Sequence, residues 1–159
     1  MKCLKNSVII ILLSLFFNLA YSDLKAQSNW EAGIRFGDRW SADLTIPLKG
    51  GGPRIHPSVY FDTFGIGAYF DWLFGLSDGP SGLKFYPGIG PEIYFPKNDV
   101  RVNIVGNFGV EYSFNFPLTI GFDWRPGFQL TNDFKWTDSN WGFMARFRIG
   151  EGSKFVRTN

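Results

Sequence analysis

The sequence predicts an all-β chain that folds as a closed antiparallel β-barrel of eight strands connected as an up-and-down meander. Apolar and polar residues alternate with a period of two in eight segments, and no segment after residue 26 has the 3.6-residue period of an amphipathic helix. The composition agrees, because 18 Phe and 19 Gly suit extended, closely paired strands better than helices, in which glycine is costly. The length of 159 residues allows one domain.

The first 26 residues differ in character from the rest of the chain. An apolar core over residues 8–19 follows a basic start and precedes small residues that end near Ala26. This order is typical of a secretory signal peptide, and the core is too short to be a membrane anchor. We therefore expect residues 1–26 to be cleaved and residues 27–159 to form the barrel.

The leader also carries the excess charge and the sole cysteine. The formal net charge is +2, and cleavage would remove Lys2, Lys5 and Lys25 together with Asp23, which leaves a neutral chain. Cys3 would leave as well, so we expect no disulfide or thiol chemistry in the mature protein. No run of Lys and Arg is present, and we expect no nucleic-acid partner.

The first two strands are expected at residues 29–37 and 40–48. Apolar residues occupy every second position from Trp30 in the first segment and from Trp40 in the second, opposite polar or small residues. Residues 38–39 between them read as a turn.

The third and fourth strands are expected at residues 57–61 and 64–76, after a glycine-rich loop over residues 49–54. The apolar phase changes from odd to even numbers at residues 62–63. A turn or a bulge within one long strand would both change the phase. We favour the turn, because it gives the even strand number of bacterial single-chain barrels.

The fifth and sixth strands are expected at residues 83–95 and 100–114. Their alternation continues on both sides of residues 96–99, which contain Pro, Asn and Asp and read as a turn.

The seventh segment, residues 118–130, alternates most regularly. Its length of thirteen residues slightly exceeds the roughly 9–11 tilted residues that cross a bilayer. It contains Pro126, and the fifth segment contains Pro87 and Pro91. Each proline removes a ladder donor, so we expect these positions at bulges or near strand ends.

The eighth strand is expected at Trp141–Ile149, after the longest link of the chain, residues 131–140. Phe134 and Trp136 in this link are candidates for an external contact or for a position at a membrane interface, where aromatic residues collect.

The apolar face of the eight segments contains no charged residue and carries most of the Trp and Phe. A charged side chain on a lipid-facing position near the midplane costs about 2–4 kcal/mol, which would explain the exclusion. An eight-stranded interior also has too little room for so many rings. We therefore expect a transmembrane barrel whose apolar face contacts lipid. The expected lipid-facing residues are Trp30, Trp40, Phe70, Trp72, Phe108, Phe122, Trp124, Phe143 and Phe147.

The opposite face combines glycines with acids and bases in equal number. Charges inside a barrel must be paired because desolvation is costly, and equal numbers suit a paired network. Such a network would plug the lumen. Its expected members are Glu31, Arg35, Asp43, Asp71, Lys84, Glu92, Arg101, Glu111, Asp123, Arg125, Arg146 and Arg148.

The pattern resembles the small eight-stranded outer-membrane barrels of diderm bacteria, the group that includes the transmembrane domain of OmpA. Residues 140–147 resemble the C-terminal assembly signal of these proteins, with a polar residue, a glycine two positions later and then apolar residues at alternate positions. Ala145 stands where an aromatic residue is usual, and residues 150–159 follow the strand. The resemblance implies periplasmic chaperones and the barrel-assembly machinery as partners through Asn140 to Phe147.

One constellation suggests an enzyme. His56 and Ser58 share a strand face, and Asp71 is a possible orienting acid, a set that faintly resembles the lipid A deacylase barrels. However, the alternation places His56 and Ser58 on the face expected to line the lumen, whereas a lipid substrate would need them on the outer face. We expect His56 to be a loop residue beside a strand start. No metal-ligand spacing or nucleotide motif is present, and we expect no metal or cofactor.

The sequence thus leads to the expectation of an exported, integral outer-membrane barrel in contact with outer-membrane lipid, with a structural, envelope-stabilising or surface-contact role. The main alternative is a secreted or periplasmic soluble barrel, like a lipocalin, that binds an apolar ligand inside. A deacylase-type barrel enzyme is the minor alternative.

Overall fold

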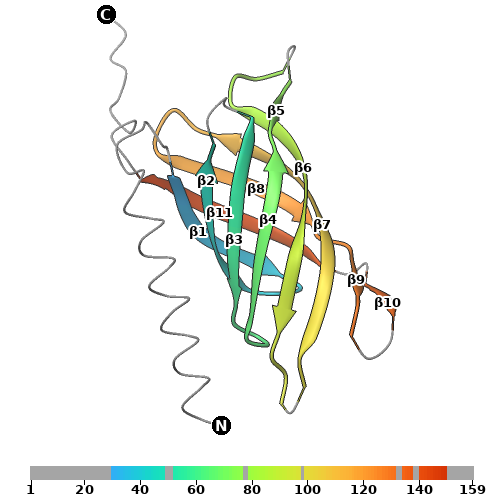
Figure 1. Cartoon of the computed structure of the whole chain (residues 1–159). Helices are drawn as coiled ribbons and strands as arrows, with labels where there is room; N and C mark the ends of the chain where they lie inside the picture. The colour runs from blue at the N-terminus through green and yellow to red at the C-terminus, as the bar shows by residue number, and fades with distance from the viewer. Residues whose placement is uncertain are drawn as a thin grey trace, which may run out of the picture.

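The computed structural model describes residues 30–48, 52–76, 79–97, 99–131, 134–137 and 140–149 (Figure 1). The predicted signal peptide lies outside these residues. The described chain is all-β, and its strands form a single sheet. The strands are β1 (Trp30–Gly37), β2 (Ser41–Pro47), β3 (Pro53–Tyr60), β4 (Gly65–Trp72), β5 (Phe74–Gly75), β6 (Leu83–Tyr94), β7 (Arg101–Ser113), β8 (Leu118–Trp124), β9 (Gly127–Gln129), β10 (Lys135–Thr137) and β11 (Trp141–Ile149).

The sheet closes on itself. Strand β11 pairs with both β8 and β1, and β6 pairs with β7, so the order of neighbours runs around a complete ring. Every pairing is antiparallel. Strand β5 continues β4, β9 continues β8, and β10 pairs only with β9, outside the ring. Eight strands therefore form the barrel wall. The predicted closed antiparallel barrel of eight strands is confirmed, and closure leaves the barrel wall without the exposed ladder groups of an open sheet.

The third strand begins earlier than predicted. Strand β3 starts at Pro53, where the sequence suggested a loop, and Leu48 N–H donates to the Pro53 carbonyl at 2.9 Å to close the β2–β3 connection. Residues 61–64 form a turn between β3 and β4, and Tyr60 pairs with Gly65 across it. The change of apolar phase therefore marks a turn and not a bulge.

Three prolines interrupt the ladders, and two of them, Pro87 and Pro126, stand where two predicted strands are divided. The ladder between β6 and its neighbours β4 and β5 is interrupted at Pro91 and at Pro87, with the same register on both sides of each gap. The ladder from β7 to β8 and β9 is interrupted at Arg125 and Pro126 in the same way. Pro126 still accepts a hydrogen bond from Gly106 N–H at 2.8 Å. Each proline lacks the N–H that would complete its pairing, so the predicted single strands 64–76 and 118–130 were wrong in their continuity.

The longest link contains β10, which forms a small hairpin with the preceding strand β9. Strand β10 pairs with β9, which in turn pairs with β7, and the hairpin projects beyond the barrel wall (Figure 1). Phe128 stacks on Phe134 with ring centroids 5.2 Å apart and contacts Trp136 at 4.5 Å. Phe134 is 75% exposed, so the ring cluster presents an apolar edge outward.

The polarity of the barrel is inverted relative to an ordinary globular core. Among the described residues the largest fully buried side chains include Arg35, Arg125 and Arg146. Large hydrophobic side chains such as Phe143 and Ile34 are more than half exposed on the outer face. The core of the molecule is therefore its polar lumen. Separately, the described residues include no helix that is long and apolar enough to cross a membrane.

Candidate functional site

A chain of buried ion pairs begins near the end of the barrel where β1 starts and β11 ends. Arg146 of β11 donates from Nε to Glu31 Oε2 at 3.2 Å and from Nη2 to Glu111 Oε2. Arg54 of β3 donates to the same Glu111 oxygen at 2.8 Å and to Asp71 Oδ2 of β4 at 3.1 Å. Five side chains from β1, β3, β4, β7 and β11 are thereby joined across the lumen.

His56 continues the chain in the middle of the lumen. Its Nδ1 lies 2.9 Å from Asp71 Oδ2, and its Nε2 lies 3.0 Å from Asp43 Oδ2. Asn107 donates to the other Asp71 oxygen at 2.8 Å. The expectation that His56 lies in a loop was wrong. His56 is an inward-facing residue of β3 and is completely buried.

The chain ends near the opposite mouth of the barrel, at two arginines. Arg125 Nη2 contacts Asp43 Oδ2 at 2.8 Å and Asp123 Oδ2 at 3.1 Å. Arg35 Nε donates to Asp123 Oδ1 at 2.7 Å, and its Nη2 donates to the carbonyl of Asn140 at 3.0 Å. Arginine suits such positions, because its planar fork reaches several acceptors at once.

Glu92 is held by phenols rather than by a base. The hydroxyls of Tyr60 and Tyr94 donate to its carboxylate at 2.8 and 2.7 Å, and the hydroxyl of Tyr69 donates to it as well. Tyrosine supplies both ring volume and a polar tip, which is what a narrow polar interior requires. Glu92 is 2% exposed, and its charge is dispersed over these three donors.

The network closes the lumen to water-sized solutes. Arg35, His56, Asp71, Asp123 and Arg146 all have 0% exposure, so a water-sized probe does not reach the middle of the described barrel. Eight strands leave an interior that side chains just fill, and here the filling is ionic.

The structure places most of the predicted network inside the lumen. Lys84 and Arg148 are only half-buried, and Arg148 donates to the carbonyls of Phe114 and Phe116 at the β7–β8 turn. The prediction that Arg101 belongs to the lumen network was wrong. Its side chain is 51% exposed and pairs with Asp99 at 3.3 Å at the barrel mouth. The buried members are Glu31, Arg35, Asp43, Asp71, Glu92, Glu111, Asp123, Arg125 and Arg146.

Sequence reasoning missed Arg54 and His56 as members of the network. Both lie in the part of β3 that contains two prolines and follows the glycine-rich loop, which hid the strand start. The alternation of a strand is nevertheless present in this segment and could have identified them. Polar residues and a tyrosine occupy every second position, at Arg54, His56, Ser58 and Tyr60, and apolar residues lie between them.

The candidate catalytic set does not assemble as a nucleophile and base. His56 directs one ring nitrogen to Asp71 and the other to Asp43, and neither is directed to a serine. Ser58 Oγ instead accepts a hydrogen bond from Arg125 Nη1 at 3.2 Å, and Ser58 is buried. Among the described residues, no group of three or more His, Cys, Asp and Glu side chains is placed to hold a metal ion.

The outer face carries the residues predicted to contact lipid. Trp40, Trp72, Phe108, Phe122, Phe143 and Phe147 are exposed, whereas Trp30, Phe70 and Trp124 are partly covered by their neighbours. Rings form stacks across adjacent strands. Trp141 lies between Phe122 and Trp124, with both centroid distances 5.3 Å. Cross-strand aromatic pairs of this kind stabilise a sheet from outside.

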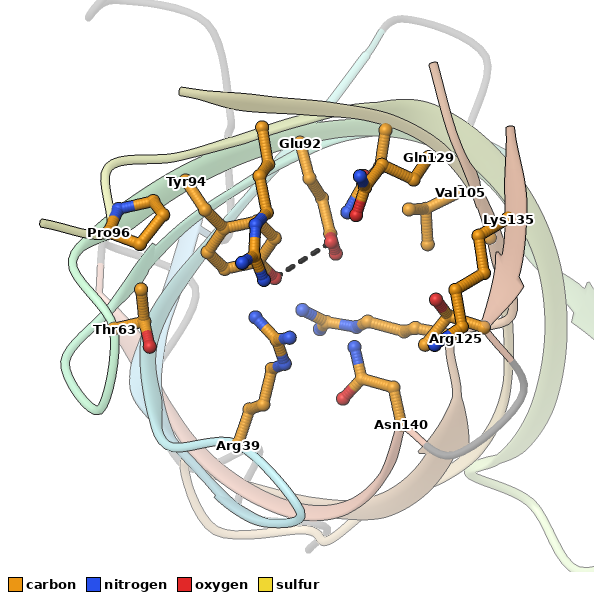
Figure 2. Close-up of a pocket in the computed structure, with 14 residues that line it drawn as sticks. Arg39, Thr63, Glu92, Tyr94, Pro96, Val105, Arg125, Gln129, Lys135 and Asn140 are labelled. Atoms are coloured by element: carbon orange, nitrogen blue, oxygen red, sulfur yellow. Dashed lines mark hydrogen bonds between the residues drawn. The ribbon is translucent and has the colours of Figure 1, made fainter. Parts of the chain in front are cut away.

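A pocket of about 190 Å³ opens at the mouth formed by the β1–β2, β3–β4 and β6–β7 turns and the β8–β11 link. We call it the mouth pocket. Figure 2 shows Arg39, Arg125 and Asn140 pointing toward one another at its centre. Its lining residues are Arg39, Thr63, Glu92, Tyr94, Pro96, Arg101, Asn103, Val105, Arg125, Gly127, Gln129, Lys135, Thr137 and Asn140.

The mouth pocket is rich in cations. Arg39 stacks over the ring of Tyr94, with its guanidinium carbon 4.2 Å from the ring centroid. Partial burial lowers the pKa of Arg39, but Tyr94, Glu92 and Asp62 raise it by more, so its pKa lies above the ordinary value. Arg39 is therefore charged at every physiological pH.

Comparison of the chain with protein-family models, with curated proteins and with solved structures found no match.

Proposed function

We propose that this chain is an integral outer-membrane protein of a diderm bacterium with a structural, envelope-stabilising or surface-contact role. The observation that carries the proposal is the inverted polarity, with charges paired inside the barrel and an apolar, aromatic outer face. In water, an apolar surface that encircles the whole barrel would cause association, because soluble monomers rarely expose patches beyond a few hundred Å². In lipid the same surface is the favoured one.

The dimensions of the barrel support the same environment. The longest strands, β6 and β7, have 12 and 13 residues, and a tilted strand needs roughly 9–11 residues to cross a bilayer. A closed barrel also satisfies its backbone groups internally, which hydrocarbon requires.

The filled lumen supports a role other than solute conduction. The ion-pair chain from Glu31 to Arg35 crosses the interior and excludes water from its centre. The parts left to contact other molecules are the turns, the mouth pocket and the β9–β10 hairpin with its exposed Phe134. Strand β11 contains most of the segment that we propose is read by the barrel-assembly machinery after export.

The alternatives have less support. A lipocalin-like barrel needs an apolar interior to bind an apolar ligand, whereas the described lumen is lined by charges and tyrosines. A deacylase needs a base that reaches its nucleophile, and the hydrogen bonds of His56 and Ser58 run to other partners.

Cysteine labelling tests the proposal directly. The only native cysteine, Cys3, lies in the predicted leader, so Phe122→Cys and Asp123→Cys would each carry one thiol. Phe122 is exposed on the outer face and Asp123 is buried in the lumen. In native outer membranes we expect a membrane-restricted maleimide to label Phe122→Cys, and a small aqueous maleimide to label neither variant. Efficient aqueous labelling of Phe122→Cys would contradict a membrane-spanning barrel.

A further inference from the structure

The mouth pocket adjoins the end of the ion-pair chain and shares Arg125 with it. Four cationic side chains, Arg39, Arg101, Arg125 and Lys135, line it, against one carboxylate, Glu92. The other lining groups are mostly amides and hydroxyls, which suit a polar ligand.

Two of these cations have no hydrogen-bond or ion-pair partner among the described residues. No hydrogen bond or ion pair joins the guanidinium of Arg39 or the ammonium of Lys135 to another described residue, although Arg39 rests on the Tyr94 ring. A third, Arg101, is held by a 3.3 Å contact to Asp99 in which both side chains are partly exposed. Exposed pairs of this kind contribute little and are readily exchanged for a better partner.

The fourth cation is buried and not fully satisfied. Arg125 is 1% exposed and uses both terminal nitrogens on Ser58, Tyr60, Asp43 and Asp123, but its Nε–H has no partner among the described residues. The Oδ1 atoms of Asn103 and Asn140 are likewise unpaired at the pocket wall. Buried polar atoms without partners are uncommon and need an explanation, such as a bound ligand or ordered water.

The single acid does not neutralise these cations by direct contact. Glu92 accepts hydrogen bonds from Tyr60, Tyr69 and Tyr94 and forms no ion pair with a lining arginine. The negative charge of Glu92 still repels an anionic ligand. It therefore lowers the affinity of the mouth pocket for an anion but does not block the pocket.

We propose that the mouth pocket binds a phosphate monoester whose organic part is a small polar group of about the size of one sugar ring. Convergent guanidinium and ammonium groups recognise phosphate oxygens by charge-assisted hydrogen bonds. The volume of about 190 Å³ far exceeds the roughly 10–15 Å³ that one water needs, so the pocket has room for a phosphate group and, toward its open side, a sugar-sized ring. The unpaired side-chain oxygens of Asn103 and Asn140 are available as acceptors for ring hydroxyls. This proposal is independent of whether the barrel spans a membrane.

Calorimetric titration of the full chain folded in detergent micelles tests the proposal, with glucose 1-phosphate, inorganic phosphate and glucose as probes. We expect glucose 1-phosphate to bind and glucose not to bind. Equal binding of inorganic phosphate would support the site and narrow its ligand to the phosphate group. Absence of binding by both phosphate probes, or equal binding of glucose and glucose 1-phosphate, would overturn it.

Variants separate the pocket from general surface charge. Arg39→Gln and Lys135→Gln should each weaken glucose 1-phosphate binding by about tenfold, the loss expected for one charge-assisted contact. Glu92→Gln should tighten it, because the opposing charge is removed. The matched control is Lys97→Gln, since Lys97 is exposed on the β6–β7 turn but does not line the pocket. Unchanged affinity in both Arg39→Gln and Lys135→Gln, or an equal loss in Lys97→Gln, would refute the assignment. Circular dichroism confirms that each variant is folded.

A lipid arm distinguishes the two sources of a phosphate monoester. The protein is reconstituted in phosphatidylcholine vesicles that contain either phosphatidylinositol 4-phosphate or phosphatidylinositol and is titrated with glucose 1-phosphate. Weaker apparent binding with phosphatidylinositol 4-phosphate than with phosphatidylinositol would assign the site to a lipid headgroup, and equal binding would assign it to a soluble ester.

Discussion

Asp71 is the residue on which the middle of the lumen depends. One of its oxygens faces both Arg54 and His56, and the other accepts a hydrogen bond from Asn107. Pairing of this kind is a condition for burying charge, and its net contribution to stability depends on both partners being present. The conformation of three strands is therefore coupled to the charge of this one side chain.

Asp71→Asn should lower the free energy of unfolding by about 3–5 kcal/mol, because it leaves Arg54 buried with one fewer negative partner. Urea unfolding in lipid vesicles, followed by tryptophan fluorescence, measures the change. The control is Asp62→Asn, in which an exposed turn carboxylate is neutralised at an expected cost within about 0.5 kcal/mol. Equal stability of the two variants would show that the lumen charges are not coupled as described.

The seam between β1 and β11 closes the barrel at the level of secondary-structure elements. The two strands pair continuously from Trp30 with Ile149 to Gly37 with Gly142. Gly33 sits in this seam, and a Cβ added there would lie 2.0 Å from the carbonyl oxygen of Ala145. Because the obstacle is backbone, it cannot rotate away as a side chain would.

Gly33→Ala should therefore force the seam apart and destabilise the barrel by about 1–3 kcal/mol or more. Gly75→Ala is the matched control, since an added Cβ at Gly75 would meet nothing within 4 Å. The readout is the urea midpoint, together with the shift in gel mobility between boiled and unboiled samples. A Gly33→Ala barrel as stable as Gly75→Ala would mean that β1 and β11 lie further apart than described.

How far the sequence predicts these elements depends on what period-two alternation can specify. It fixes which face a residue takes within a strand, so the inward direction of residues such as Glu111 and Arg146 follows from it. It does not specify where the wall ends. Arg101 has the inward parity, yet it lies at the first position of β7 and remains exposed at the mouth.

Long-range pairing accounts for the remaining differences. The gap between β4 and β5 at Leu73 adjoins Trp72, which lies opposite Pro87 in the register of the ladder. The gap between β8 and β9 contains Arg125 and Pro126, which lie opposite residues of β7. The mouth pocket brings together Arg39, Arg101 and Lys135, because the segments that carry them meet at the same end of the closed barrel. Neither relation is local in sequence, so neither could be predicted from alternation alone.

At the scale of the whole molecule, the question is whether the apolar outer face contacts lipid or water. Phe108 lies near the middle of β7, is 41% exposed and packs beside Trp124 with ring centroids 6.0 Å apart. Phe134 belongs to the projecting β9–β10 hairpin and is 75% exposed. The two positions differ in their expected depth within a bilayer, and a charge placed at each reports on that depth.

Phe108→Lys should destabilise the barrel in vesicles by about 2–4 kcal/mol, the cost of a lysine near the bilayer midplane, whereas Phe134→Lys should cost at most about 1 kcal/mol. Phe108→Leu separates the loss of ring packing from the effect of charge. Reversible urea unfolding from vesicles gives all three values. If Phe108→Lys costs no more than Phe108→Leu, the outer face is in contact with water and the inverted polarity needs another explanation. If the excess cost appears only at Phe108, the apolar belt lies in the membrane and the β9–β10 hairpin lies outside it.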